Sequence, residues 1–145
     1  MNTDLARSAL SVFMGSGFAG RVANAGQWQV VLFLGVFYHL VDPIAALRSL
    51  AAITQEVLIL ETHLELRSLT PAMAFYPNTE LNGDPTNWWA PNAPAVEAML
   101  KKVFGFQKVL VAPNPVSHGI RGIFHAFKTE AIYEEHRRRI AAEHG

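Results

Sequence analysis

The stretch WQVVLFLGVFYHLVDPIAALRSLAAITQEVLILETHLE, residues 28–65, decides the fold. Its near-continuous aliphatic run at Val30–Leu34 is typical of a strand that is covered on both faces of a sheet. Asp42-Pro43 is a helix N-cap followed by proline at the first helical position, and the apolar residues after it recur at helical spacing. Val57–Leu60 is a second buried strand. Strand, helix and strand at this spacing predict a parallel, right-handed βαβ unit.

Both predicted strands end in polar or ionisable residues. Open α/β sheets bind their ligands outside the carboxyl ends of their strands. The sequence therefore places a candidate functional site at this edge of the sheet. The residues there are Tyr38, His39 and Asp42 after the first strand, and Glu61, Thr62 and His63 after the second.

The composition is that of one globular domain. The 145 residues are 50% hydrophobic and 17% charged, which is enough apolar material for a buried core. The formal net charge of zero gives no global field that attracts nucleic acid or an anionic membrane. The absence of cysteine excludes disulfides and thiolate chemistry. No signal peptide is evident, and no apolar run approaches the roughly 20 residues of a membrane span. We therefore expect a cytoplasmic protein without a membrane partner.

The second half of the chain adds an insertion, a helix, two strands and a final helix. Residues 64–92 show no sustained period, and long irregular segments in compact domains are usually lids or binding loops. Asn92 caps the helix that follows the insertion. Strands are expected at Phe106–Ala112 and Ile120–Lys128, and their short connection makes them antiparallel. A polar helix at about 130–143 closes the chain.

Two sequence segments carry a resemblance to a known family. LFLGVFYHLVDPIAAL, residues 32–47, resembles the fourth-strand motif of methyltransferases related to the tRNA wobble-uridine modifying enzymes. EVLILET, followed by FYPNTELNGDPTNWWAPN at 75–92, is similar to the fifth strand and the substrate-side insertion of a branch of that group. The resemblance covers about residues 28–128. It implies the C-terminal half of a class I S-adenosylmethionine-dependent methyltransferase.

The resemblance implies an α/β fold with part of its sheet missing. The expected sheet is a partial Rossmann-like methyltransferase sheet, made of the parallel βαβ unit and the C-terminal antiparallel strand pair. In the family, the first three strands hold most of the cofactor, and residues 1–27 are too few to form them. We interpret 1–27 as an atypical segment of helix and loop, and 28–145 as the methyltransferase half of a truncated chain. Within 1–27, Gly15–Gly20 matches G-x-G-x-x-G, but a predicted helix precedes it, so we interpret it as a loop.

Two functions follow from this interpretation. The first is S-adenosylmethionine-dependent methyl transfer to an unidentified acceptor, weak or absent in this chain alone. The second is a non-catalytic binding or assembly module that dimerises, or docks onto a companion chain, through the exposed edge strand 30–34.

Candidate cofactor and catalytic residues lie around the end of the first strand. The resemblance implies that Leu34, Gly35 and Tyr38 lie against S-adenosylmethionine. Gly35 lets a ligand approach the backbone, and Tyr38 offers a ring face and a hydroxyl, although it could equally be a core aromatic residue. His39 or His63 could act as the base that takes the proton of the acceptor, and His39 is the better candidate because its strand adjoins the cofactor in the family. The alternative is a structural histidine that is bonded to the backbone.

The insertion and the start of the last strand supply candidate substrate contacts. Their amides, carboxylates and indole rings suit a sugar, a base or an amphipathic acceptor. RNA, sugar and small-metabolite acceptors all remain open, although zero net charge disfavours a large RNA footprint. In the related tRNA enzymes an arginine near this edge helps to hold an anionic ligand group, a role that the resemblance assigns to Arg121. The alternative is a self-packed loop that covers the sheet edge. The candidate residues are Glu61, Asn82, Asp84, Asn87, Trp88, Trp89, His118 and Arg121.

A metal site at this edge is the weaker interpretation. Glu61, His63 and Glu65 alternate, so they share one face of an extended segment. With His39 or His118 they could hold a divalent metal, or they could orient a polar substrate. Their spacing matches no dedicated metal signature, and we expect no metal.

Overall fold

The computed structural model describes residues 21–22, 24–65, 68–113 and 120–144. The predictions for residues 1–20 and for His118 fall outside these described residues. The elements and their bounds are β1 (Trp28–Leu34), the 3₁₀ turn η1 (Phe37–His39), α3 (Pro43–Ile53), β2 (Thr54–His63), β3 (Met73–Phe75), β4 (Trp89–Pro91), α4 (Ala93–Ala98), the π-helical turn η2 (Met99–Val103), β5 (Lys108–Pro113), β6 (Arg121–Phe127) and α5 (Glu130–His144).

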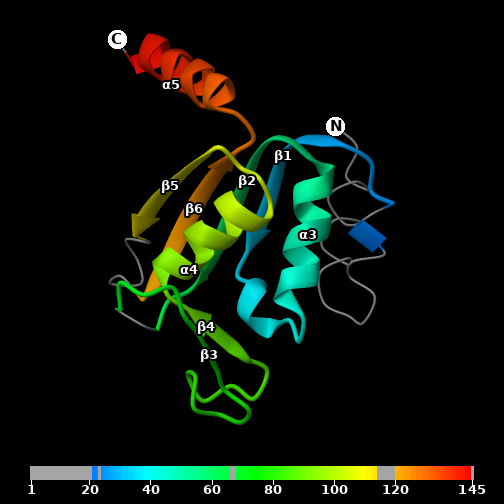
Figure 1. Cartoon of the computed structure of the whole chain (residues 1–145), viewed down its shortest axis with the longest axis vertical. Coiled ribbons are helices and arrows are strands. Elements are labelled where there is room, and N and C mark those ends of the chain that lie inside the picture. Colours follow the sequence, from blue (N-terminus) through cyan, green and yellow to red (C-terminus); the bar gives the residue numbers. More distant parts are fainter. Residues whose placement is uncertain (1–20, 23, 66–67, 114–119, 145) are drawn as a thin grey trace.

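Four strands form the main sheet, in the order β1-β2-β6-β5. β1 and β2 are parallel, whereas β6 runs antiparallel to both of its neighbours, β2 and β5. α3 and α4 lie over one face of this sheet (Figure 1). The core lies between this sheet face and the helices. Its largest members include Phe33, Leu47, Leu58, Leu60, Leu100 and Phe124. The structure confirms the predicted partial Rossmann-like sheet, a parallel βαβ unit followed by an antiparallel pair.

The helix boundaries follow local capping signals. The Asp42 carboxylate accepts a hydrogen bond from the Ala45 backbone N–H at 2.9 Å, and α3 begins at Pro43, as predicted. The Asn92 side chain caps α4 in the same way through the Ala95 N–H. β2 is longer than the predicted Val57–Leu60, because its first residue, Thr54, pairs with β1 and its last residue, His63, pairs with β6.

One expectation about β1 was wrong. Its aliphatic run predicted burial on both faces, but only Val31 and Phe33 are buried. The alternate residues Val30, Leu32 and Leu34 are 47%, 55% and 50% exposed. An unbroken aliphatic run does not tell which face a neighbouring layer covers, and α3 covers only one. Among the described residues β1 pairs with β2 alone, so the prediction of an edge strand is confirmed.

The insertion contains more regular structure than its sequence predicted. β3 and β4 form a small antiparallel ladder in which Phe75 pairs with Trp89. This hairpin lies beyond the carboxyl ends of β1 and β2 (Figure 1). Asn92 is fully buried where the hairpin joins α4, and it accepts from the Ala72 N–H while it donates to the carbonyls of Ser68 and Thr70. A single amide thus joins the first part of the insertion to its last residue at the start of α4.

In the described part of the chain, no helix is both long enough and apolar enough to cross a membrane. No group of three or more histidine, aspartate or glutamate side chains there is arranged to hold a metal ion.

Candidate functional site

The site is organised around Gly35, the residue that follows β1. Gly35 has φ +70°, a left-handed conformation that L side chains rarely adopt, and its N–H donates to the Glu61 carbonyl at 3.1 Å. A Cβ at this position would lie 3.6 Å from the Arg121 Nη2, 3.7 Å from the Tyr38 hydroxyl and 3.8 Å from the Glu61 Oε2. The backbone therefore turns at a point where three polar side chains from β2, β6 and η1 converge.

These three side chains form one hydrogen-bonded cluster. Arg121 binds Glu61 through two N–H groups, Nε to Oε1 and Nη2 to Oε2, the latter at 2.7 Å. Arg121 Nη2 also donates to the Tyr38 hydroxyl at 2.9 Å, and its guanidinium lies 5.0 Å from the centre of the Tyr38 ring. The hydrogen bonds from Arg121 to Glu61 raise the pKa of Arg121 further above its ordinary value. A fork of this kind is rigid, because both partners are planar.

This pairing bears on the anion-binding role predicted for Arg121. Its charge is already compensated by Glu61, which is only 8% exposed. An anionic ligand group would have to share or replace the carboxylate. The predicted roles of Glu61 and Arg121 in binding a ligand stay predictions, and the structure adds that the two residues act as a pair.

Contacts with the insertion select one tautomer of His39. Its Nδ1 lies 3.1 Å from the carbonyl oxygen of Thr86 and 3.0 Å from the Thr86 hydroxyl. That hydroxyl donates to the Asp84 Oδ1 at 2.7 Å, which also accepts from the Thr86 N–H at 2.8 Å. A carbonyl can only accept, so Nδ1 carries the proton, and in the neutral ring Nε2 is the basic nitrogen. The Thr86 hydrogen bonds lower the pKa of Asp84.

His63, the other candidate base, lies in a more enclosed position. It is 3% exposed, and its Nε2 lies 3.4 Å from the Glu65 carboxylate. Its Nδ1 lies 3.5 Å from the side-chain nitrogen of Asn82, and its ring meets the Tyr38 ring edge-on at 6.5 Å. A base must reach the acceptor, and this burial makes His39 the better placed of the two.

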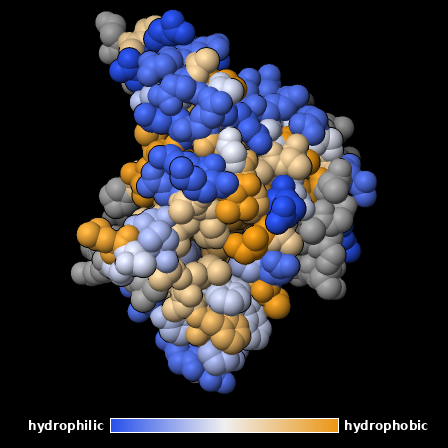
Figure 2. All heavy atoms as spheres, in the orientation of Figure 1, coloured by the Kyte–Doolittle hydropathy of each residue, from blue (hydrophilic) through white to orange (hydrophobic). Residues whose placement is uncertain are grey.

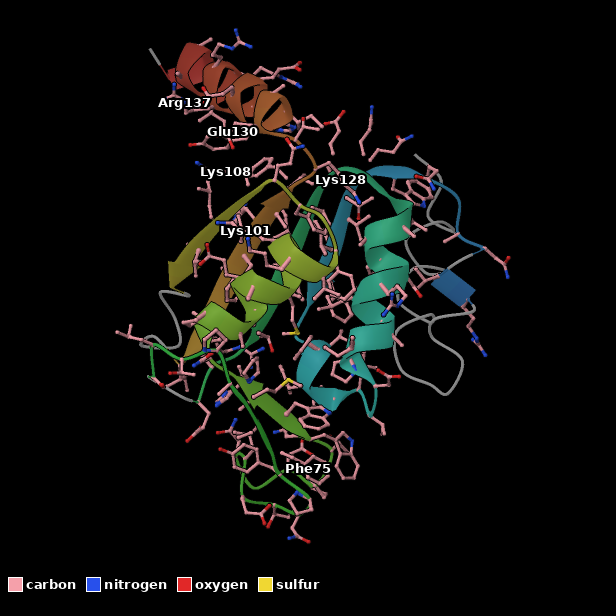
Figure 3. The ribbon with its side chains drawn as sticks, viewed as in Figure 1. Phe75, Lys101, Lys108, Lys128, Glu130 and Arg137 are labelled. Carbon is pink, nitrogen blue, oxygen red and sulfur yellow. The ribbon has the colours of Figure 1, made fainter. Side chains whose placement is uncertain are left out.

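The tryptophan segment of the insertion is hydrogen-bonded to η1 and to the residues just after it. The backbone N–H of Trp88 donates to the Tyr38 carbonyl at 2.7 Å, and the indole Nε1 of Trp89 lies 3.4 Å from the Val41 carbonyl. The ring of Phe75 stacks on Trp88 and tilts against Trp89. We call Phe75, Trp88 and Trp89 the aromatic platform. It lies on the hairpin, where Figure 3 labels Phe75.

The remaining predicted residues take different positions. Asn87 is 4% exposed, and its side chain donates to the Leu81 carbonyl, so it shapes the loop. Asn82 adopts a left-handed φ of 59° beside Gly83. Leu34 presents its side chain on the exposed face of β1. His118 lies outside the described residues.

Sequence reasoning missed two members of the site, Thr86 and Phe75. Thr86 follows Asp84-Pro85, a turn signal that predicts the hydrogen bond to Asp84 but not the contact with His39, 47 residues away. Phe75 shows no local signal. Its role becomes visible only when β3 and β4 pair.

Comparisons with known proteins support the fold. No protein-family model matches the sequence, and no curated protein is significantly similar to it. Several solved structures do match, among them the N-terminal domain of EvdMO1 in the presence of S-adenosylhomocysteine (SAH) and D-fucose, and the same domain with SAH bound. Both are 20% identical to this chain and cover 75% of it, with TM-scores of 0.50 and 0.51. The chain covers 50% and 49% of those domains, about half of their length. At this identity the likeness shows the fold alone, a partial Rossmann-like α/β sheet that this chain shares with those domains.

Proposed function

We propose that this chain forms the acceptor-side half of an S-adenosylmethionine-dependent methyltransferase. The observation that carries the proposal is the convergence of Tyr38, Glu61 and Arg121 on Gly35 at the carboxyl edge, beside a histidine whose basic nitrogen is defined. A ligand site at this edge is what an open α/β sheet provides. The likeness to SAH-bound domains supports the same cofactor here, and the narrower relation to the tRNA wobble-uridine branch remains part of the proposal.

The residues around Gly35 fit the amino-acid end of the cofactor. This end carries one carboxylate and one ammonium group, and Arg121 and Glu61 offer one charge of each sign. Gly35 leaves the backbone accessible because it has no side chain, and Tyr38 adds a hydroxyl and a ring face. When bound, S-adenosylmethionine supplies a methyl group on a positively charged sulfur. The protein residues then have to orient the acceptor and take its proton.

His39 is the residue assigned to proton removal. Thr86 fixes the Nδ1 proton, so Nε2 can accept the proton that an acceptor hydroxyl or amine loses as it is methylated. Asp84 orients Thr86 through two hydrogen bonds and makes the arrangement more rigid. Methyl transfer depends on the alignment of donor and acceptor, so much of the catalytic effect comes from positioning.

The exposed side of β1 supports a second part of the proposal. In a parallel sheet the ligand lies where the strand order reverses, and further strands beyond β1 would create that point beside Gly35. β1 is the outermost strand of the described sheet. On one face of this strand, Val30, Leu32 and Leu34 form an exposed apolar stripe. We propose that additional strands, of the same or another polypeptide, pair with β1 and complete the cofactor pocket. A module that only assembles through this edge is the alternative function.

Calorimetric titration of the purified chain with SAH tests the proposal, with its mass in solution recorded alongside. We expect weak binding, with a dissociation constant above about 100 μM, because the described strands supply only one side of the proposed pocket. A low-micromolar dissociation constant would show that the pocket is complete. It would contradict the proposal that additional strands pair with β1. No binding up to millimolar SAH by a folded dimer would contradict methyl transfer and favour the assembly module.

A further inference from the structure

We infer that the methyl acceptor is a neutral sugar, and that the aromatic platform (Phe75, Trp88 and Trp89) is its binding surface. The inference rests on the proposed methyl transfer and names the acceptor class for that same site. Three observations carry it: the shape of the platform, its connection to His39 through Thr86, and the charge of residues 68–92.

The platform is an aromatic cluster in which Phe75 is exposed and the two tryptophans are half-buried. The Phe75 and Trp88 rings are stacked nearly parallel, at 10° with centroids 6.2 Å apart. Trp89 adds a third ring, tilted by 47° with its centroid 4.8 Å from that of Phe75. Phe75 is 54% exposed although it is a phenylalanine. Figure 2 shows apolar side chains in the middle of the hairpin lobe, whereas strongly hydrophilic ones gather over α5. Ring faces of this kind pack against the C–H faces of pyranoses.

The platform is physically connected to the candidate base. Thr86, which holds His39, and Trp88, which donates to the Tyr38 carbonyl, belong to one short segment of the insertion. A molecule that lies on the platform therefore lies beside the segment that positions His39. The same segment brings Asp84, whose carboxylate can accept hydrogen bonds from sugar hydroxyls.

The charge of the insertion favours a sugar over RNA. Residues 68–92 contain no lysine, arginine or histidine, and their only charged side chains are Glu80 and Asp84. Hydrogen bonds from Asn78 lower the pKa of Glu80, and those from Thr86 lower the pKa of Asp84, so both are ionised at neutral pH. Within residues 68–92 these two carboxylates repel phosphate groups, which bind through lysine and arginine. The single cation of the insertion, Arg67, precedes this stretch in the sequence. Hydroxyl groups meet no such repulsion.

Tryptophan fluorescence can report on the platform directly. The chain has three tryptophans, and Trp28→Phe, at the far end of β1, leaves only the two of the platform. This variant is titrated with D-fucose, with methyl β-D-glucopyranoside and with oligouridine. We expect a saturable change with at least one sugar and none with oligouridine. Adding Phe75→Ala should weaken sugar binding by about tenfold, because it removes an exposed ring that contributes one face of contact. Tyr133→Ala in α5 is the matched control and should leave sugar binding unchanged.

The outcomes separate the acceptor class from the proposed methyl transfer. The inference would be overturned if neither sugar changed the fluorescence. It would also be overturned if the protein preferred oligouridine, or if Phe75→Ala did not weaken the response to sugar. The SAH titration of the same protein is scored independently. SAH binding without a sugar response would overturn the acceptor class and leave methyl transfer standing. A Phe75-dependent sugar response without SAH binding would support the sugar site and contradict methyl transfer.

Discussion

A tyrosine, a carboxylate and a cation meet at each end of the sheet. The carboxyl-edge cluster consists of Tyr38, Glu61 and Arg121, and the α5 cluster consists of Lys108, Glu130 and Tyr133. The cation lies at nearly the same distance from the tyrosine ring in both, 5.0 Å and 4.9 Å. Figure 3 labels Lys108 and Glu130 near α5, at the end of the molecule remote from Phe75.

The two clusters differ in burial and in what they surround. The Glu61 side chain is 11% exposed and holds Arg121 through two N–H groups, whereas the Glu130 side chain is 54% exposed and lies 3.4 Å from a single ammonium. The carboxyl-edge cluster encloses Gly35, and the α5 cluster joins a helix to the end of a strand. Residue types alone therefore do not mark a site. The carboxyl-edge cluster differs from the α5 cluster in that its side chains converge on a left-handed glycine.

The largest difference should appear when the carboxylates are neutralised. Glu61→Gln should lower the free energy of unfolding by about 2 kcal/mol, because it leaves a shielded guanidinium without its charged partner. Glu130→Gln should lower it by less than about 1 kcal/mol, since an exposed ion pair contributes little. Urea unfolding of both variants measures the two losses. Equal losses would remove the distinction between the clusters.

A second comparison uses two glycines with almost the same backbone angle. Gly35 has φ +70° and Gly105 has φ +74°, and Gly105 has nothing within 4 Å of a built Cβ. Alanine at either position should cost about 1–2 kcal/mol of stability, because L residues are strained there. Only Gly35→Ala should also weaken SAH binding, which calorimetry measures. Equal weakening by Gly105→Ala would show that SAH binding reports stability and not a local site.

The smallest effect concerns Asp84 and acid. Its pKa lies below the usual 3.8 because Thr86 donates two hydrogen bonds to the carboxylate. A lowered pKa means that the stability which Asp84 contributes is present above 3.8 and is lost as pH falls through the lower, folded-state value. The stability difference between the wild type and Asp84→Asn should therefore shrink between about pH 5 and about pH 2. Thermal unfolding across this range measures it, and a constant difference would contradict the Thr86 contact.

Local signals in the sequence predicted the elements better than the contacts between them. Asp42-Pro43 and Asn92 each cap a helix through residues three positions away, so short-range chemistry was sufficient. The polar residues after β1 and β2 were expected at one edge, and the parallel register confirms it by pairing Leu34 with Glu61.

Long-range pairing could not be predicted in the same way. The bond between Arg121 and Glu61 spans 60 residues and depends on the register of β6 on β2, which no local pattern encodes. The metal interpretation of Glu61, His63 and Glu65 rested on their alternation in the sequence, which carries no information about the ion pair between Arg121 and Glu61. The exposed face of β1 was missed because its aliphatic residues carry no information about the layer beside them.

The central claim is that the carboxyl edge around Gly35 is where the cofactor binds. Two-dimensional amide NMR spectra of the labelled chain, titrated with SAH to about 1 mM, test it most directly because they detect weak binding at each residue. The account predicts shifts at Gly35, His39 and Glu61, with the amides of α5 unchanged. Shifts confined to α5, or no shifts at all, would contradict it.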